Sequence, residues 1–255
     1  MSLFRIALQT LLLREIQRFT RIWSQTLLPP AITMSLYFII FGKLIGPQIR
    51  EIDGYAYIKY IVPGLVMMSI MTSAYANTSS SFFLTKFNKS IEEMLVSPMQ
   101  NLVILLGFTL GGALRGLIIG VVVLAISLLF TSLVVHHLWI VIVMAILSAM
   151  VFSLGGFINA VYAKRFDDIS FIPTFLITPL TYLGGVFFSI KQLSPGWAYI
   201  STFNPILAMV DTFRYGLLGV SDLTITWGFS LVFILLIVLF AWAWILLHKG
   251  VGIKV

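Results

Sequence analysis

Six long apolar runs separated by short polar breaks fill most of this 255-residue sequence and leave little chain for a water-soluble domain. Hydrophobic residues make up 60% of the chain, charged residues only 10%, and the mean hydropathy is +1.05. Because an ordinary globular domain is about a quarter charged, this composition indicates an integral membrane protein. A crossing helix needs about 20 apolar residues. The runs that qualify are 27–46, 60–83, 102–134, 138–162, 169–190 and 224–247.

The runs are continuous and do not alternate with a period of two, which favours helices over barrel strands. We therefore expect an all-α polytopic membrane protein with six transmembrane helices, forming a single domain over residues 1–255. The sequence has no Cys, so no disulfide or Cys-ligated metal is expected. The first twenty residues are amphipathic and charged, unlike a cleavable signal.

Lysine and arginine in the loops predict the orientation. With the N-terminus inside, ten fall in inner segments: Arg5, Arg14, Arg18, Arg21, Lys86, Lys89, Lys164, Arg165, Lys249 and Lys254. Five fall in outer segments: Lys43, Arg50, Lys59, Lys191 and Arg214. This excess places both termini in the cytoplasm. The net charge of +7 then reflects topology and contact with anionic headgroups, and nucleic-acid binding is not expected.

Residues 3–25 are expected to form an amphipathic helix along the inner membrane surface. Its apolar residues recur at three- and four-residue steps: Phe4, Leu8, Leu12, Ile16, Phe19 and Trp23. Another face carries Arg14, Arg18, Arg21 and Gln25. The helix is either a lipid-surface anchor or a contact for a partner. Pro29 and Pro30 are expected to mark the turn into the first span, because proline is tolerated only in a helix's first turn.

The first inner loop is expected to contain a short helix. Ser90 and Glu93 have the spacing of a capping box, and Pro98 disfavours helix at Ser97. The segment is either a connector resting on the bilayer or a patch that docks in another protein. Its residues are Ser90, Ile91, Glu92, Glu93, Met94, Leu95, Val96 and Pro98.

Polar residues within the predicted spans are few. All nine acidic residues lie outside the spans, which disfavours an ion-driven carrier. Arg115 either snorkels at the inner end of a span over 116–135 or lines a path. The stretch 77–81, which begins with Asn77, either lines a path or bonds to neighbouring helices. Gly112, Gly116 and Gly120 are expected to pack against another helix.

Residues 191–219 are expected to form an outer re-entrant helical hairpin, because Pro195 and Pro205 divide them into pieces too short to cross a bilayer. Asp211 and Arg214 are spaced to pair on one helical face. The aromatic residues of the hairpin, Trp197 and Phe203 among them, either gate an exit and touch lipid-like cargo or anchor the chain at the interface.

Two local patterns resemble those of the ABC-2 type permeases, the membrane subunits of ATP-driven exporters, and the resemblance extends along nearly the whole chain. Residues 92–98 resemble that family's acidic-leucine-proline coupling loop. The family's C-terminal signature is matched by Ile177, Leu180, Leu183, Gly184, Val186, Leu193, Ser194, Pro205, Ile206 and Arg214. Ala208 departs from it, since the pattern has His, Arg, Ser or Tyr there.

The resemblance implies that residues 90–96 and Pro98, with Arg14, Arg18 and Arg21, contact a separate ABC ATP-binding subunit. It implies an outer gate or substrate path formed by Asn77, Gly184, Gly185, Phe187, Phe188, Trp197, Phe203, Pro205, Asp211 and Arg214. A permease homodimer is also implied. The sequence itself has no G-x-x-x-x-G-K-[ST] loop, because its one Gly-Lys pair, Gly42-Lys43, is followed by Leu44. We therefore expect no catalytic residue and no cofactor on this chain, with ATP and Mg on the partner.

The expected function is permease subunit of an ATP-driven exporter in a bacterial inner membrane. Its expected cargo is a drug or an amphipathic, glycan-like or lipid-like molecule. The alternative is an ATP-independent carrier or channel. An intramembrane enzyme is disfavoured, because His136, His137 and His248 all lie near span ends.

Overall fold

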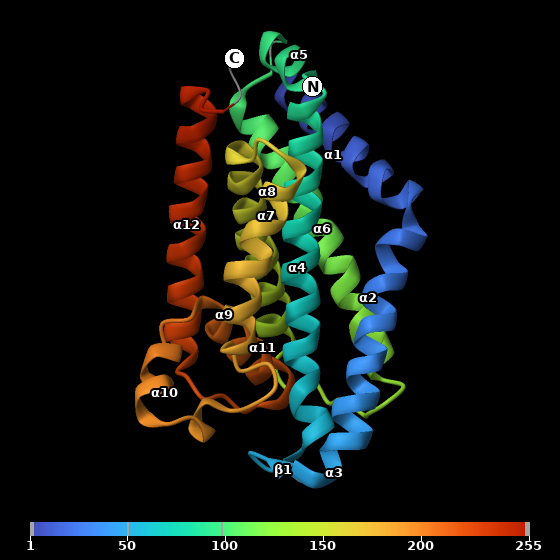
Figure 1. Cartoon of the computed structure of the whole chain (residues 1–255), viewed down its shortest axis with the longest axis vertical. Helices are drawn as coiled ribbons and strands as arrows, with labels where there is room; N and C mark the ends of the chain where they lie inside the picture. The colour runs from blue at the N-terminus through green and yellow to red at the C-terminus, as the bar shows by residue number, and fades with distance from the viewer. Residues whose placement is uncertain (1–2, 50, 98, 253–255) are drawn as a thin grey trace.

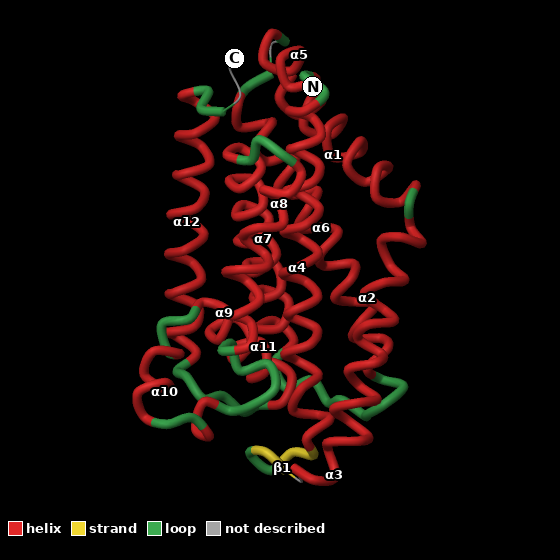
Figure 2. Tube along the Cα trace, viewed as in Figure 1, coloured by secondary structure: helices red, strands yellow, loops and turns green. Residues whose placement is uncertain are grey.

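The computed structural model describes residues 3–49, 51–97 and 99–252, most of them in helices. Figure 1 shows long helices along one axis, with the two ends of the chain at the same end of the bundle. We call this the terminal end. The opposite end carries a two-stranded β-hairpin and most of the loops between helices, and we call it the hairpin end (Figure 2).

Three long helices form the centre of the bundle: α4 (Tyr57–Phe87), α6 (Asn101–Ser127) and α7 (Leu138–Tyr162). α4 packs along both of the others. α12 (Ile225–Lys249) and the helical segment Trp23–Ile49 are more peripheral, with only 22% and 11% of their most apolar windows buried. These five are the helices, within the described residues, that are long and apolar enough to cross a membrane. They correspond to all the predicted runs except 169–190.

Glycine allows α6 to approach α4 closely. A Cβ at Gly116 would lie 2.7 Å from the Ile70 carbonyl oxygen, and one at Gly112 would overlap the Thr78 hydroxyl. A Cβ at Gly120 would likewise overlap the Ile70 side chain. Steps of four residues keep these glycines on one helix face, which confirms the predicted packing role.

α6 ends earlier than predicted, at Ser127 instead of Val134. The Ser127 hydroxyl donates to the Leu124 carbonyl, a local bond typical of helix ends. Phe130 then packs on Phe38 with ring centroids 5.5 Å apart. No helix covers 116–135, so the span on which the snorkelling interpretation of Arg115 depended does not form as predicted. Arg115 lies in the middle of α6.

The predicted span 169–190 is broken. Its helical part consists of α8 (Phe166–Ile172), a π-helical turn η2 (Pro173–Ile177) and α9 (Thr178–Tyr182). Pro173 has no N–H to donate, so the regular ladder is interrupted where the π turn begins. The three pieces together span about 25 Å, less than the ~30 Å of a hydrocarbon core. The chain then turns irregularly through Gly185, whose φ is +65°, so the predicted count of six transmembrane helices is not confirmed.

The segment predicted to form an outer re-entrant hairpin contains two helices, α10 (Pro195–Ser201) and α11 (Pro205–Leu218), divided at the two prolines as predicted; its entry into the outer leaflet is not confirmed. A short 3-10 turn, η3 (Ile190–Gln192), precedes them. α11 is almost entirely buried against α4, α7 and α12, while α10 exposes its apolar residues. Only the first limb therefore has a free face.

The β-hairpin pairs β1 (Glu51–Ile52) with β2 (Tyr55–Ala56) at the hairpin end. Asp53 and Gly54 form its turn with φ of 48° and 80°, the conformation that two-residue hairpins favour. The Tyr55 hydroxyl donates to the Leu218 carbonyl at 2.5 Å, which ties the β-hairpin to the end of α11.

The N-terminal segment is one helix, α1 (Leu3–Arg21), followed by a break at Ile22. The next helix is α2 (Trp23–Tyr37), which continues through a π-helical segment η1 (Phe38–Ile45) into α3 (Gly46–Ile49). Pro29 and Pro30 lie inside α2, so the prediction that they mark the turn is wrong. The elbow is stabilised at Thr26, whose hydroxyl donates to the Phe19 carbonyl at 3.2 Å.

Candidate coupling surface

α5 (Ser90–Val96) projects at the terminal end of the bundle, directly after α4 (Figure 1). Ile91 is 1% exposed and anchors the helix against the core, whereas Val96 is 89% exposed. Glu92 and Glu93 are also exposed. α5 therefore presents two carboxylates and one apolar side chain on a helix that is fixed at its first turn.

The start of α5 differs from the predicted capping box. Its N-cap residue is Lys89, in the left-handed conformation with φ of 59°, and no side chain bonds to the cap. Ser90 is already helical, so the Ser90–Glu93 box does not form. Ser97 is extended with ψ of 159°, as the following proline predicted. Pro98 itself lies outside the described residues.

Lys86, in the last turn of α4, stabilises the junction between α4 and α5. Its ammonium group donates to the carbonyls of Val161 at 2.6 Å and Ala163 at 2.7 Å, where α7 ends. A cation at a helix C-terminus is favourable because the last carbonyls there are unpaired. The end of α4 is thus fixed to the end of α7 immediately before α5 begins.

α1 lies beside α5. A hollow of about 340 Å³ separates them, and its lining residues are Arg14, Ser90, Glu93, Met94, Ser97 and Met99. Four of the predicted ATPase contacts thus border one depression. We call Arg14, Glu92, Glu93, Met94 and Val96 the α1–α5 surface. Leu95 is half-buried beside it, and Arg21 is exposed at the far end of α1.

α1 packs along α6 by the same four-residue step on both helices. Leu11 lies against Gly107 and Glu15 against Gly111, where a Cβ would come within 2.7 Å of the Glu15 Cβ. The buried stripe of α1 is Leu11, Glu15 and Phe19, which is not the predicted apolar face. Because the contacts recur every four residues on both helices, α1 runs alongside α6 and does not cross it at a single point.

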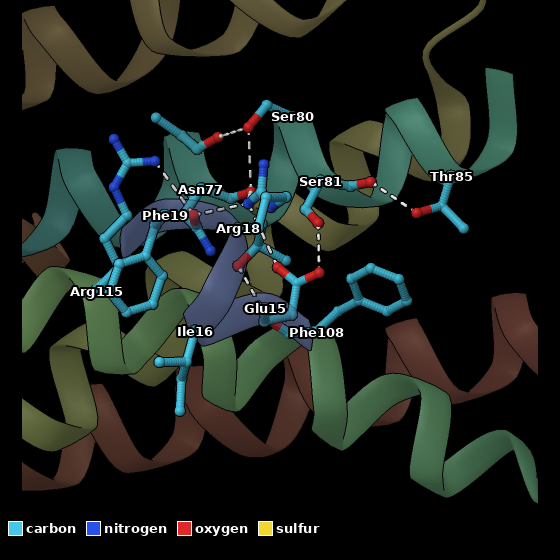
Figure 3. Close-up of polar contacts among 12 residues, drawn as sticks. Glu15, Ile16, Arg18, Phe19, Asn77, Ser80, Ser81, Thr85, Phe108 and Arg115 are labelled. Atoms are coloured by element: carbon cyan, nitrogen blue, oxygen red, sulfur yellow. Dashed lines mark hydrogen bonds and ion pairs between the residues drawn. The ribbon is translucent and has the colours of Figure 1, made fainter. Parts of the chain in front are cut away.

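A buried polar network joins α1 to α4 (Figure 3). Glu15 is 2% exposed and accepts a hydrogen bond from the Ser81 hydroxyl at 2.7 Å. Arg18 pairs with the other Glu15 oxygen at 3.3 Å. Burying a carboxylate is costly unless it is paired and hydrogen-bonded, and both of these oxygens are satisfied.

Asn77 extends the network to α6. Its side-chain oxygen accepts from Arg18 at 2.7 Å and from Arg115 at 3.1 Å, and its backbone oxygen accepts from Arg18 at 3.1 Å. Asn77, predicted as part of an outer gate or path, is therefore placed with α1. Arg18, predicted as a surface contact, is turned into the bundle. Sequence reasoning did not single out Glu15; its four-residue spacing from Leu11 and Phe19 was the available signal.

The neighbouring hydroxyls of α4 also bond to other helices. The Thr78 and Ser153 hydroxyls are 2.6 Å apart, and Ser153 donates to the Thr109 carbonyl at 2.6 Å. Ser80 bonds only to carbonyls of its own helix. Of the two interpretations of residues 77–81, bonding between helices is the one that these contacts favour.

At the hairpin end, Arg214 is 1% exposed and lies over the Tyr60 ring, 4.0 Å from its centroid. It pairs with Asp211 at 3.6 Å and donates to the Gly185 carbonyl. The predicted pair is present, but it is buried rather than on a surface. It fixes the irregular segment that follows α9 against α11 and α4.

Asp211 continues this polar cluster by accepting from the Asp222 and Leu223 backbone N–H groups at 2.9 Å each. Asp222 in turn pairs with Lys191 at 3.2 Å, and Lys191 pairs with Asp53 at 3.1 Å. The hydrogen bond to Asp53 raises the pKa of Lys191. The β-hairpin, η3 and the start of α12 are thereby connected.

The remaining predicted gate residues fall into two groups. Gly184 and Gly185 are buried, and Phe187 packs on Phe41 with centroids 4.9 Å apart; Phe188 is half-buried. Trp197 and Phe203 are more than half exposed on and after α10. Pro205 borders an apolar cavity of about 290 Å³ that α7, η2, α9, α11 and α12 enclose.

Comparison with known proteins identifies the family of the chain. The family model of the ABC-2 type transporters matches residues 6–218. The inner membrane transport permease YadH of Escherichia coli K12 is 49% identical over 254 residues, covering 100% of this chain and 99% of that protein. Nodulation protein J of Rhizobium leguminosarum bv. viciae is 24% identical over 189 residues, covering 72% of this chain and 71% of that protein. The family model and the YadH match both include the α1–α5 surface and Arg214, and the chain belongs to the ABC-2 type transporter family.

Proposed function

We infer that this chain is the permease subunit of an ATP-driven export complex and that a separate ABC subunit hydrolyses ATP. The observation that carries this proposal is the α1–α5 surface, where exposed Glu92, Glu93 and Val96 stand on a helix anchored by Ile91. An apolar side chain flanked by carboxylates suits a groove in a partner protein. The lack of a phosphate-binding loop in the sequence supports the division between two chains.

The contacts behind this surface supply a route for motion. A displacement of α5 would be transmitted to α4 and α7 through Ile91 and Lys86. A displacement of α1 would be transmitted to α4 and α6 through Glu15 and Arg18. Because both routes join the same central helices, closure of an ATPase pair would move these helices together as a rigid body.

The hairpin end is the proposed exit. In this proposal α10 dips into the outer leaflet with its exposed aromatic residues, while Arg214 and Gly185 hold the irregular segment behind it. Two copies of the chain would form the path between them for an amphipathic, glycan-like or lipid-like molecule or a drug. The largely unburied segment Trp23–Ile49 supports a face free for lipid or for a second copy.

The proposed location is a bacterial inner membrane with both termini in the cytoplasm. The Lys and Arg distribution supports this orientation, and the common end of the termini in Figure 1 is compatible with it. The relative YadH is named as an inner membrane protein, which supports the location.

The test is to extract the tagged chain in mild detergent and to identify what remains bound in stoichiometric amount. We expect a Walker-motif ATPase. A homo-oligomer without any nucleotide-binding partner would contradict the proposal and favour the carrier or channel alternative.

A charge-reversal variant then locates the contact. Glu92→Lys with Glu93→Lys should reduce ATPase recovery at least tenfold, because two exposed carboxylates become cations while the anchor Ile91 is untouched. Glu51→Lys, an exposed reversal at the hairpin end, is the matched control and should leave recovery unchanged. Equal recovery for both variants would move the docking site away from α5.

A further inference from the structure

The buried network around Asn77 carries more positive than negative charge. Arg18 and Arg115 converge on one Asn77 oxygen, but Glu15 is the single carboxylate in the network and pairs with Arg18. Arg115 takes part in no ion pair within the described ranges of the chain, and its Nη1 donates to Asn77 while its Nε is enclosed, so Nη2 carries the donors that an outside group can reach. A guanidinium held in this way leaves donors available for an anion.

Figure 3 shows how this guanidinium lies. One nitrogen reaches the Asn77 side chain, and the rest of the group faces away from Glu15 and Arg18. The Phe19 ring is drawn beside the Arg115 side chain, and both residues line the same hollow. The available donors therefore point out of the network and not back toward the α1 carboxylate.

An apolar hollow of about 110 Å³ adjoins Arg115 at the elbow between α1 and α2. Its other walls include Phe19, Thr20, Trp23, Leu27 and Ile119. A hollow of this composition offers nothing to a free inorganic anion, which would have to give up its water there. It suits a molecule that joins an anionic group to hydrocarbon.

The length of the following segment and the residue types at the elbow favour a position at the membrane interface. The helical segment from Trp23 to Ile49 has 27 residues and is about 40 Å long, whereas the hydrocarbon core is about 30 Å thick. At least one end of the segment therefore extends into the headgroup region. Trp23 is 60% exposed and Arg21 is exposed, a pairing of residue types typical of the membrane interface.

We propose that Arg115 and the hollow at the α1–α2 elbow form a binding site for an anionic membrane lipid. The lipid phosphate accepts from the free edge of the Arg115 guanidinium, and the first part of an acyl chain fills the hollow beside Phe19 and Trp23. The bound lipid neutralises the excess charge of the network and fastens α1 to α6. The site does not depend on which cargo the protein moves.

The test is lipid titration of the purified, delipidated full chain with whatever subunit co-purifies, followed by its thermal unfolding midpoint. Phosphatidylglycerol should raise the midpoint saturably, and phosphatidylcholine should do so at concentrations at least tenfold higher. Arg115→Gln should remove this preference, because a charge-assisted hydrogen bond to phosphate is lost. Arg5→Gln changes an exposed arginine of α1 that lies outside both the elbow and the α1–α5 surface, so it is the matched control and should keep the preference.

A second measurement does not require the Arg115→Gln variant to fold. Phosphatidylglycerol with brominated chains should quench Trp23 fluorescence, measured as the difference between the wild type and Trp23→Phe, more strongly than brominated phosphatidylcholine. Equal quenching by the two lipids, or an undiminished preference in Arg115→Gln, would overturn the proposal. A rise in the unfolding midpoint of the wild type with inorganic phosphate alone would also overturn the proposal, since the site would then bind a free anion.

Discussion

At the residue scale, Glu15 is the least expected participant in this protein. It lies on a helix whose other charged residues are all arginines, yet it is buried and bonded to Ser81 and Arg18. Hydropathy and helical periodicity treat it as one polar residue among several. Its role depends on Gly111, which lets α1 approach α6 closely enough to enclose the carboxylate.

We expect Glu15→Gln to lower the free energy of unfolding by about 1–3 kcal/mol, because Arg18 loses its charged partner while remaining largely enclosed. The measurement is the thermal or denaturant unfolding midpoint in detergent. Glu92→Gln removes a carboxylate from the exposed face of α5 and serves as the control, with an expected change near zero. A Glu15→Gln midpoint equal to that of the control would show that the network adds nothing to stability.

Arg115 could be recognised from the sequence as unusual, but its partner could not. The residues that decide its environment, Asn77 and Phe19, come from two other helices far away in the chain. Local sequence therefore reveals an expensive charge without revealing what satisfies it. The same holds for Arg214, whose contact with Gly185 follows from an irregular turn that hydropathy does not detect.

At the scale of elements, the apolar runs predicted four of the spanning helices closely, because length and hydropathy alone decide where a helix can cross. The breaks were harder to predict. The α1–α2 elbow depends on a bond from Thr26 to Phe19, and the end of α6 is accompanied by packing of Phe130 on Phe38. Tertiary contacts of this kind leave no local signal in a uniformly apolar sequence.

The approach of α6 to α4 can be tested at one position. Gly116→Ala should destabilise the chain by about 1–3 kcal/mol, because the added Cβ would lie 2.7 Å from the Ile70 carbonyl oxygen and force the helices apart. The matched control is Gly155→Ala on α7, where the nearest atoms belong to the Tyr75 ring at 3.8 Å. The measurement is the unfolding midpoint of each variant in detergent, compared with that of the wild type. Equal tolerance of the two substitutions would contradict the close-packing role of Gly116.

At the scale of the whole molecule, the α1–α5 surface and the cluster around Arg214 lie at opposite ends of one helix, α4. Tyr60 contacts Arg214 near one end, while Asn77 and Ser81 bind α1 toward the other. Because α4 is enclosed by its neighbours, displacement at the terminal end cannot be absorbed locally without breaking its packing. A single element therefore connects the proposed docking surface with the proposed exit.

The orientation has a direct test, because the sequence contains no Cys and single cysteines can be labelled without background. Ser132→Cys, in the loop after α6, should react with a membrane-impermeant maleimide in intact spheroplasts. Val96→Cys on α5 should react only after permeabilisation. The reverse pattern would place α5 outside and would contradict cytoplasmic coupling.

The network that holds α1 also constrains how the chain is assembled during synthesis. Arg18 and its acceptor Asn77 are separated by 59 residues, and Arg115 comes later still. At about 5–20 residues per second, α1 leaves the ribosome several seconds before the helices that receive it. The residues that enclose its carboxylate belong to α4 and α6, so α1 is made before these helices and reaches its final position only after them.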